Sequence, residues 1–368
     1  MAWSSLFAVE MLIAAFAGGA FGAAIGALPA FIFTGFMVIA GEAANLARGA
    51  AVEAAGVDPS TLGAIGITGS VAFGPVFSPA ISFAGGAAAA AYAAKRGYMD
   101  TGFDFHEAKN IAFAQGTKPD VLVVGGLFGI VGYWFTVASS TLAMPYDPIA
   151  MGVVLSALVH RLALGYPLVG DAPNGLLNMR PFESEDRRVV GEAAVDGGAG
   201  ADSNAEADGG VVHERFVVEP WLPHQYRWLN VFVLGAVMGV LGGFVAVKTG
   251  SPFLAFGISA ASLVFLNCGV ENVPVTHHMT LPASTAALAA LPVGFDPASQ
   301  SAVLTAVLAG AAFGGVCALF GELFQRVFYA HGDTHWDPPA AGIVFGTFLV
   351  AVAAALGIFP HTSWVPAL

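Results

Sequence analysis

The sequence predicts an all-α, polytopic membrane protein with about ten membrane segments in two related halves. Only 10% of its 368 residues are charged and 57% are hydrophobic, whereas an ordinary soluble domain is about 25% charged. The apolar residues also come in continuous blocks, several of them near the roughly 20 residues that a helix needs to cross a bilayer. Continuous blocks lack the alternation of a transmembrane β-barrel. We therefore expect a multi-pass protein of the cell membrane, surrounded by the lipid bilayer.

The first half is expected to cover residues 1–170. Its apolar stretches are residues 6–28, 30–47, 61–94, 121–143 and 149–164. The third stretch is too long for one simple span, and Gly74, Pro75 and Pro79 interrupt it. Because proline removes a backbone hydrogen-bond donor, we expect two short half-helices around Pro75, as a re-entrant hairpin or as a kinked span.

An acidic linker, residues 171–224, follows the first half. Between Asp171 and Glu219 it has 11 acidic and 4 basic residues, and residues 191–210 are rich in Gly, Ala, Asp and Ser. Low hydrophobicity with high net charge predicts a disordered segment, which we place in the cytoplasm. No basic patch occurs in the sequence, so nucleic acid is not an expected partner.

The second half is expected to cover residues 225–368. Its apolar stretches start near residue 229 and continue at residues 251–268, 283–293, 301–329 and 340–358. A polar break from Glu271 to Pro282, which contains Pro274, separates two of them. Polar groups at such a place are unfavourable in lipid unless they face a cavity, a partner or the interface.

The two halves share features in the same order, which favours an internal duplication. Residues 146–154 and 336–344 both read aromatic, Asp, Pro, any residue, Ala, any residue, Gly, aliphatic, Val. Asp before Pro is typical of a turn that opens a helix, so Asp147 and Asp337 are expected to cap helices. The other explanation is convergent composition, because Gly and Ala are abundant in the whole chain.

If the halves are related, Pro75 and Pro274 mark equivalent broken segments. Broken segments at corresponding positions of two halves point to a substrate site near the middle of the bilayer. Half-helix ends and unpaired carbonyl groups at such breaks can bind ions or polar solutes.

The charge distribution leaves two topologies open. With five crossings per half, the halves are inverted, both termini are outside, and all but two of the 13 Lys and Arg residues lie on the linker side. The exceptions are then Arg48 and Lys248. With re-entrant hairpins and four crossings per half, the halves are parallel, both termini are inside, and the exceptions are Arg326 and Lys248. Charge does not choose between the two, and we favour ten segments.

Candidate pathway residues are polar side chains in or near the breaks. Ionisable residues inside a membrane mark functional sites by default, although a position at the interface explains Glu42 and Glu271 equally well. Serine and threonine near prolines can instead satisfy freed backbone groups. The candidates are Glu42, Ser78, Ser82, Glu271, Thr276, His277, His278 and Thr280.

The adjacent histidines His277 and His278 are the most chemically distinctive pair. On a helix they point about 100° apart, so they do not chelate a metal as an i, i+4 pair does. Outside a helix, or with help from Glu271, they could bind a metal ion or relay protons. The alternative is a pair of histidines at the wet end of a segment.

In whole-chain composition, acidic linker and duplicated halves, the sequence resembles uncharacterised multi-pass membrane proteins of haloarchaea. This resemblance implies a location in the cell membrane and no particular activity. We expect a transporter or channel for a small solute or ion, with its site between the broken segments. A homo-oligomer is one assembly that such a protein could form. The alternatives are an intramembrane enzyme that uses His277, His278 and Glu271, or a membrane scaffold. Nucleotide-binding, HExxH and GxSxG motifs are absent from the sequence, so an enzyme is the less expected reading.

Overall fold

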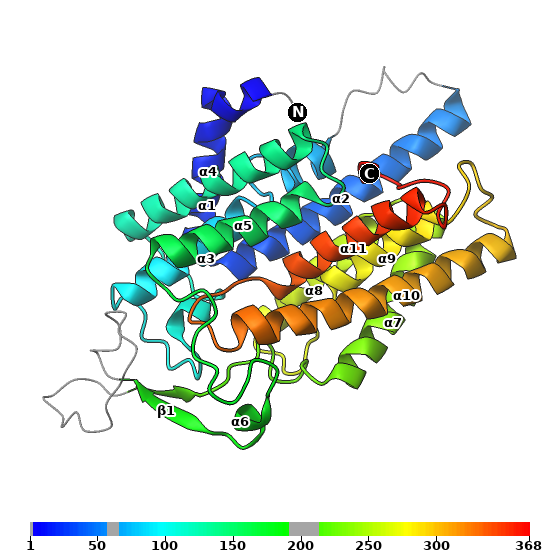
Figure 1. The fold of residues 1–368 in the computed structure, drawn as a ribbon. Coiled ribbons are helices and arrows are strands. Elements are labelled where there is room, and N and C mark those ends of the chain that lie inside the picture. The colour runs from blue at the N-terminus through cyan, green and yellow to red at the C-terminus, as the bar shows by residue number, and fades with distance from the viewer. Residues whose placement is uncertain (1–2, 57–65, 191–212) are drawn as a thin grey trace, which may run out of the picture.

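A two-stranded β-ribbon lies at one end of a bundle of helices (Figure 1). The computed structural model describes residues 3–56, 66–190 and 213–368. Five helices in these residues are long and apolar enough to cross a bilayer, and three shorter apolar helices accompany them. This confirms the predicted class, a mostly helical protein of membrane type.

In the first half, the predicted helices and the predicted break are present. The long helices are α1 (Val9–Ile25), α2 (Ala27–Ala55), α3 (Ser82–Lys95), α4 (Pro119–Thr141) and α5 (Pro148–Ala163), and the short ones are η1 (Trp3–Phe7), η3 (Ile67–Ala72) and η4 (Glu107–Lys109). Helix α1 packs on α3 and α4, and α5 packs on α4. Pro75 lies in the non-helical residues 73–81, between η3 and α3. Residues 61–65 of the predicted third stretch lie outside the described residues.

In the second half, the helices follow the same succession. They are α7 (Trp228–Thr249), α8 (Leu254–Asn267), α9 (His277–Ala289), α10 (Gln300–Phe324), η6 (Gln325–Tyr329) and α11 (Pro338–Ala355). Helix α7 packs on α9 and α10, and α11 packs on α10. Pro274 lies in the non-helical residues 268–276, as expected. The break is shorter than predicted, because α9 begins at His277 and contains Pro282. A proline inside a helix removes one hydrogen bond, which the packed surroundings of α9 tolerate.

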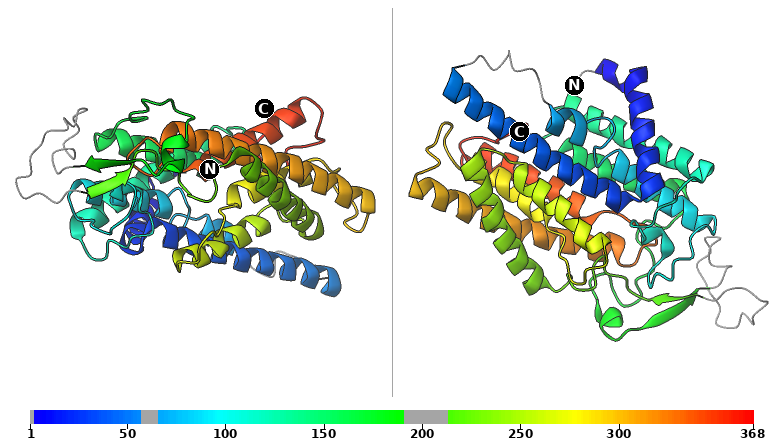
Figure 2. Two further views of the ribbon diagram at one scale, coloured as in Figure 1. Left: turned by 90° about the horizontal axis from the view of Figure 1, so that it is seen from below. Right: turned by 180° about the vertical axis from the view of Figure 1, so that it is seen from behind.

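The two halves meet along two helix pairs, α2 with α8 and α5 with α11. Figure 2, right, shows α2 running beside α8. In Figure 1 the colours show that α4 and α10 run in opposite directions, as do α5 and α11. Helices α4 and α5 are therefore oriented oppositely to α10 and α11, respectively.

The end of the bundle that carries the ribbon is called the linker face below. There, Phe216 of the ribbon donates its N–H to the carbonyl of Asp104, and Glu219 donates to the carbonyl of Ala330. The opposite end, the far face, holds the C-terminus and the turn before α10. His361 near the C-terminus contacts the carbonyl of Leu291 at that turn.

The linker is more ordered than the sequence predicts, in the parts that the structure describes. It contains α6 (Arg180–Glu183) and the antiparallel strands β1 (Arg187–Val190) and β2 (His213–Phe216). Glu219 and Leu222 are buried against the helices. The prediction of disorder rested on overall charge, and it missed these local contacts. Residues 191–212, which include most of the Gly-rich stretch, lie outside the described residues.

The two Asp-Pro turns cap helices, as predicted. The Oδ1 atom of Asp147 accepts the N–H groups of Ile149 and Ala150 at the start of α5. The Oδ2 atom of Asp337 accepts the N–H of Ala340 at the start of α11, at 2.7 Å. Both aspartates therefore satisfy donors that have no partner within their own helix.

Candidate functional site

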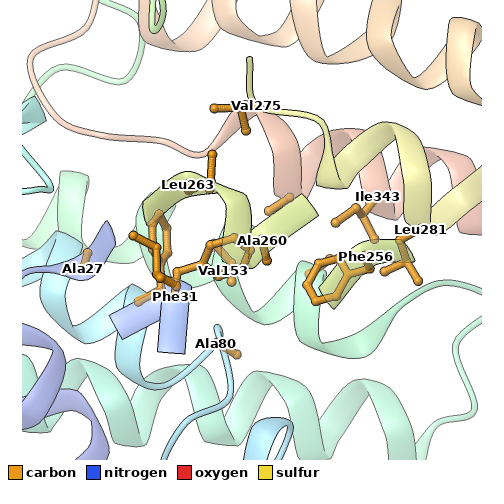
Figure 3. Packing of buried hydrophobic residues seen from close by; sticks show 14 of the residues in the cluster. Ala27, Phe31, Ala80, Val153, Phe256, Ala260, Leu263, Val275, Leu281 and Ile343 are labelled. Carbon is orange, nitrogen blue, oxygen red and sulfur yellow. The ribbon is translucent and has the colours of Figure 1, made fainter. Parts of the chain in front are cut away.

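A cavity with a volume of about 300 Å³ lies between the two halves. Most of its lining side chains are aromatic or aliphatic, and they come from α2, α3, α5, α8, α9 and α11. Figure 3 shows a representative set of them, Phe31, Val153, Phe256, Leu281 and Ile343. Apolar walls with a few placed polar groups are typical of sites for small organic ligands.

The polar lining consists of a few ionisable groups at separate places on the wall. They are Lys109, Asp147, His277, Tyr329, His335 and Asp337. The Nε2 atom of His335 lies 3.1 Å from Oδ1 of Asp337. Asp147 caps α5 through Oδ1, and its backbone N–H donates to the Oγ1 atom of Thr347 on α11. Each aspartate therefore caps the start of a helix and also lines the cavity.

The two adjacent histidines face different surroundings. Both lie on α9, and successive side chains on a helix point in different directions. His277 lines the cavity, and its ring centroid is 4.7 Å from that of Phe31. The His278 ring packs edge-on against Trp221, with the centroids 5.9 Å apart. The two imidazole centroids are 6.0 Å apart. This arrangement agrees with the divergent directions expected for neighbours on a helix.

The four hydroxyl candidates lie at the starts of α3 and α9. Ser82 donates to backbone carbonyls, Thr280 donates to the carbonyl of His277, and Thr276 bonds to Ser259. Ser78 is buried with no partner for its Oγ atom among the described residues. Three of these side chains therefore support the local backbone or a neighbouring helix.

The two carboxylate candidates lie away from the cavity. Glu271 is exposed in the connection between α8 and α9. Glu42 is buried, and its carboxylate accepts hydrogen bonds from Asn45, Thr68 and Ser251, the last at 2.5 Å. Glu42 therefore joins α2 to η3 and to the turn before α8.

We expect Glu42→Ala to destabilise the protein by about 2 kcal/mol, because hydrogen bonds to a charged group are stronger than neutral ones. Unfolding by denaturant in detergent micelles measures this change. Glu53→Ala on the same helix is the control, since Glu53 is exposed and the substitution should change stability by less than about 0.5 kcal/mol. Equal stability of the two variants would argue against a structural role for Glu42.

A network of salt bridges lies at the linker face next to the cavity. Lys109 Nζ lies 2.6 Å from Oε2 of Glu219, and both side chains are almost fully buried. Burial lowers the pKa of Lys109 to about 8, although Glu219 opposes this shift. Burial alone would raise the pKa of Asp333. The ionisable groups around its carboxylate, including Arg215, outweigh this effect and hold the pKa at about 2. The network fixes the loop before α4 to the chain that follows the ribbon.

Among the described residues, no group of three His, Cys, Asp or Glu side chains is placed to hold a metal ion. His277 and His278 diverge, and Glu271 is exposed. The arrangement thus provides an apolar chamber with a few ionisable groups, two of which, His335 and Asp337, are paired.

Comparison with known proteins places the chain in a family. The model described as "Family of unknown function (DUF7973)" matches residues 1–368. The chain belongs to this family. No curated protein and no solved structure matches it. The expected resemblance to an uncharacterised family is confirmed, and membership of DUF7973 supplies no activity.

In this DUF7973 protein the cavity uses residues that the sequence did not single out as site residues. Asp147 and Asp337 were expected only as helix caps, and His335, Trp221 and Trp364 were not candidates. In the sequence, the recurring Asp-Pro turn is the signal that singled out Asp147 and Asp337. Trp221 and Trp364 reach the cavity from irregular segments. The sequence of such a segment has no hydrophobic periodicity from which its position could be predicted.

Proposed function

We propose that the protein is a transporter that carries a small organic solute across the membrane by alternating access to the central cavity. The observation that carries this proposal is the matched lining of the cavity. Helix α5 contributes Asp147 at its cap and Val153 six residues later, and α11 contributes Asp337 and Ile343 at the same spacing. A site shared by two oppositely oriented halves is the arrangement on which such transporters rely.

Inverted, duplicated halves are part of the proposal. In support, α1 packs on α3 and α4 as α7 packs on α9 and α10. The close contacts also correspond: a Cβ atom at Gly19 would lie 2.1 Å from the carbonyl oxygen of Gly125, and one at Gly239 would lie 2.1 Å from that of Gly310. The opposite directions of α4 and α10 in Figure 1 support inversion.

We further propose ten crossings, in which residues 66–95 and 268–289 each pass through the membrane as a broken segment. The linker face would then be cytoplasmic. This orientation is supported by Lys95, Arg161 and Arg326, which donate to carbonyl groups of the segment from Leu164 to Leu177. A concentration of Lys and Arg on one side is typical of the cytoplasmic side.

The lining favours an organic solute over a bare inorganic ion. An ion site replaces the hydration shell with several convergent oxygen atoms, whereas this wall is mostly carbon. Aromatic and aliphatic walls instead stabilise the apolar body of a solute. The few ionisable groups would then orient its polar end.

Alternating access predicts that a cysteine in the cavity reacts with an impermeant thiol reagent from either side of the membrane. The test uses Ala150→Cys and Ala340→Cys, at corresponding places on α5 and α11, in a chain with Cys268 and Cys317 replaced by serine and alanine. We expect labelling in both right-side-out and inside-out vesicles, because a minor state of roughly 1% population is enough for reaction.

The matched control is Ala89→Cys, since Ala89 is fully buried in α3 and does not line the cavity. It should remain unlabelled from both sides. Labelling of Ala150→Cys and Ala340→Cys from one side alone, or from neither, would contradict alternating access. Two-sided labelling accompanied by steady ion conductance would identify a channel instead.

A further inference from the structure

His335 and Asp337 form a buried pair at the cavity wall. Asp337 Oδ2 is held by the N–H of Ala340 at the start of α11, while Oδ1 lies 3.1 Å from Nε2 of His335. One carboxylate oxygen is thus fixed by the helix, and the other faces an imidazole nitrogen. Both side chains line the central cavity, so a proton there is within reach of a bound solute.

The same pair also packs beside His160 of α5, in a tight contact region between α3 and α5. His160 is fully buried, and neither of its ring nitrogens has a partner among the described residues. The Nδ1 atom of His335 likewise has none there. Buried polar atoms are nearly always hydrogen-bonded, so unpartnered ones need an explanation such as a bridging water or a functional role.

Several charged and titratable groups surround the pair. Helix α5 contributes His160 and Arg161, η6 contributes Tyr329, α9 contributes His277, and η4 contributes Lys109, which is paired with Glu219. The Tyr329 ring lies 5.3 Å from that of His335, and Arg161 donates to Oγ1 and to the carbonyl of Thr334. Arg161 is therefore held by fixed acceptors beside the pair and makes no ion pair with Asp337.

The other half of the molecule has the carboxylate without the imidazole. Asp147 caps α5 as Asp337 caps α11, but the residue two positions earlier is Pro145, where the second half has His335. The pairing of an imidazole with the capping carboxylate is consequently present in the second half and absent from the corresponding turn of the first.

We propose that His335 and Asp337 bind the proton that drives the transport cycle. This inference rests on the proposed transport function. In the loaded state Nδ1 of His335 carries one proton, and a second proton lies between Nε2 of His335 and Oδ1 of Asp337. The site unloads when Nδ1 releases its proton to water in the cavity, and the shared proton then stays on Nε2 beside the Asp337 carboxylate. Return of one proton to Nδ1 restores the loaded state.

The test measures how pH shifts the access of the cavity, using Val153→Cys on α5 as the reporter in the chain without native cysteines. The ratio of labelling from the two sides is compared between roughly pH 5 and pH 8, the range in which histidine titrates. The ratio removes the pH dependence of the thiol itself. We expect it to change by at least about 10-fold, equivalent to about 1.4 kcal/mol between the two access states.

The variants then separate the proton site from a general effect of acid. His335→Gln and Asp337→Asn should abolish the change in the ratio. Asp296→Asn should keep it, because Asp296 is exposed and does not line the cavity. A change that persists in His335→Gln or Asp337→Asn, or that disappears equally in Asp296→Asn, would overturn the proposal.

The outcome is distinguishable from failure of the transport function. Two-sided labelling that is independent of pH would support the transport proposal and overturn the proposed proton site. If labelling is not two-sided, infrared difference spectra between acid and alkaline samples decide the proton site alone. A protonated-carboxyl band that is lost in Asp337→Asn, and kept in Asp296→Asn, would support it, and a band unaffected by Asp337→Asn would overturn it.

Discussion

Glu219→Gln is expected to destabilise the protein by about 4 kcal/mol, because it leaves the buried ammonium group of Lys109 without its counter-ion. Lys109 and Glu219 are 2.6 Å apart, and both side chains are at most 1% exposed. Water therefore does not compensate for the lost charge. Denaturant unfolding in detergent micelles measures the change in the free energy of unfolding.

The double variant Lys109→Met, Glu219→Met distinguishes the pair from a mere loss of packing. Replacing both ions by apolar side chains of similar volume is often nearly neutral, so it should restore most of the lost stability. The exposed pair Arg187 and Asp104 is the control, and Asp104→Asn should cost less than about 1 kcal/mol. A double variant as unstable as Glu219→Gln would refute the account based on an unpaired buried charge.

Gly239→Val is expected to reduce the stability of the second half by more than about 3 kcal/mol, because the crossing of α7 and α10 leaves no room for a side chain. A Cβ atom there would lie 2.1 Å from the carbonyl oxygen of Gly310, which is backbone and cannot rotate away. The helices must then move apart. In a membrane, close packing is the main attraction between helices, so the loss extends along the whole interface.

Gly19→Val should have an effect of similar size, since its Cβ atom would lie 2.1 Å from the carbonyl oxygen of Gly125 at the crossing of α1 and α4. Gly49→Ala is the control, because nothing lies within 4 Å of its added Cβ atom. It should leave stability unchanged or raise it by up to about 1 kcal/mol through helix propensity. Thermal unfolding in micelles compares the three variants, and a Gly239→Val protein as stable as Gly49→Ala would contradict the packing argument.

The sequence was sufficient to predict the helices, the two breaks and the two helix caps. Long apolar blocks and prolines are local signals, and so is an aspartate before a proline. Of the eight predicted pathway residues, His277 lines the cavity, Glu271 is exposed and Glu42 joins α2 to its neighbours. Local polarity locates breaks in a helix, but it does not say which side of the break faces a cavity.

The cavity could not be predicted for the same physical reason. Its walls are mainly phenylalanine and aliphatic side chains, and such residues occur equally in packed cores and against lipid. The pairing of His335 with Asp337 depends on the turn that brings them together, and the burial of Lys109 depends on a contact with Glu219 that is 110 residues away. The linker was misjudged because its charge is high on average, while its ordered parts are held by a few individual contacts.

The positions of Trp221 and Trp364 give the cavity two natural optical reporters. Trp221 enters the wall from the chain that follows the ribbon, and Trp364 enters it from the C-terminal segment. The indole of Trp364 is fixed by a hydrogen bond to Thr285, and that of Trp221 packs against His278. Indole emission responds to the polarity of its surroundings, so each tryptophan reports the wetting of its own part of the cavity wall. Fluorescence from variants that keep Trp221 or Trp364 as the one remaining tryptophan of six would therefore follow each part separately, without an added dye.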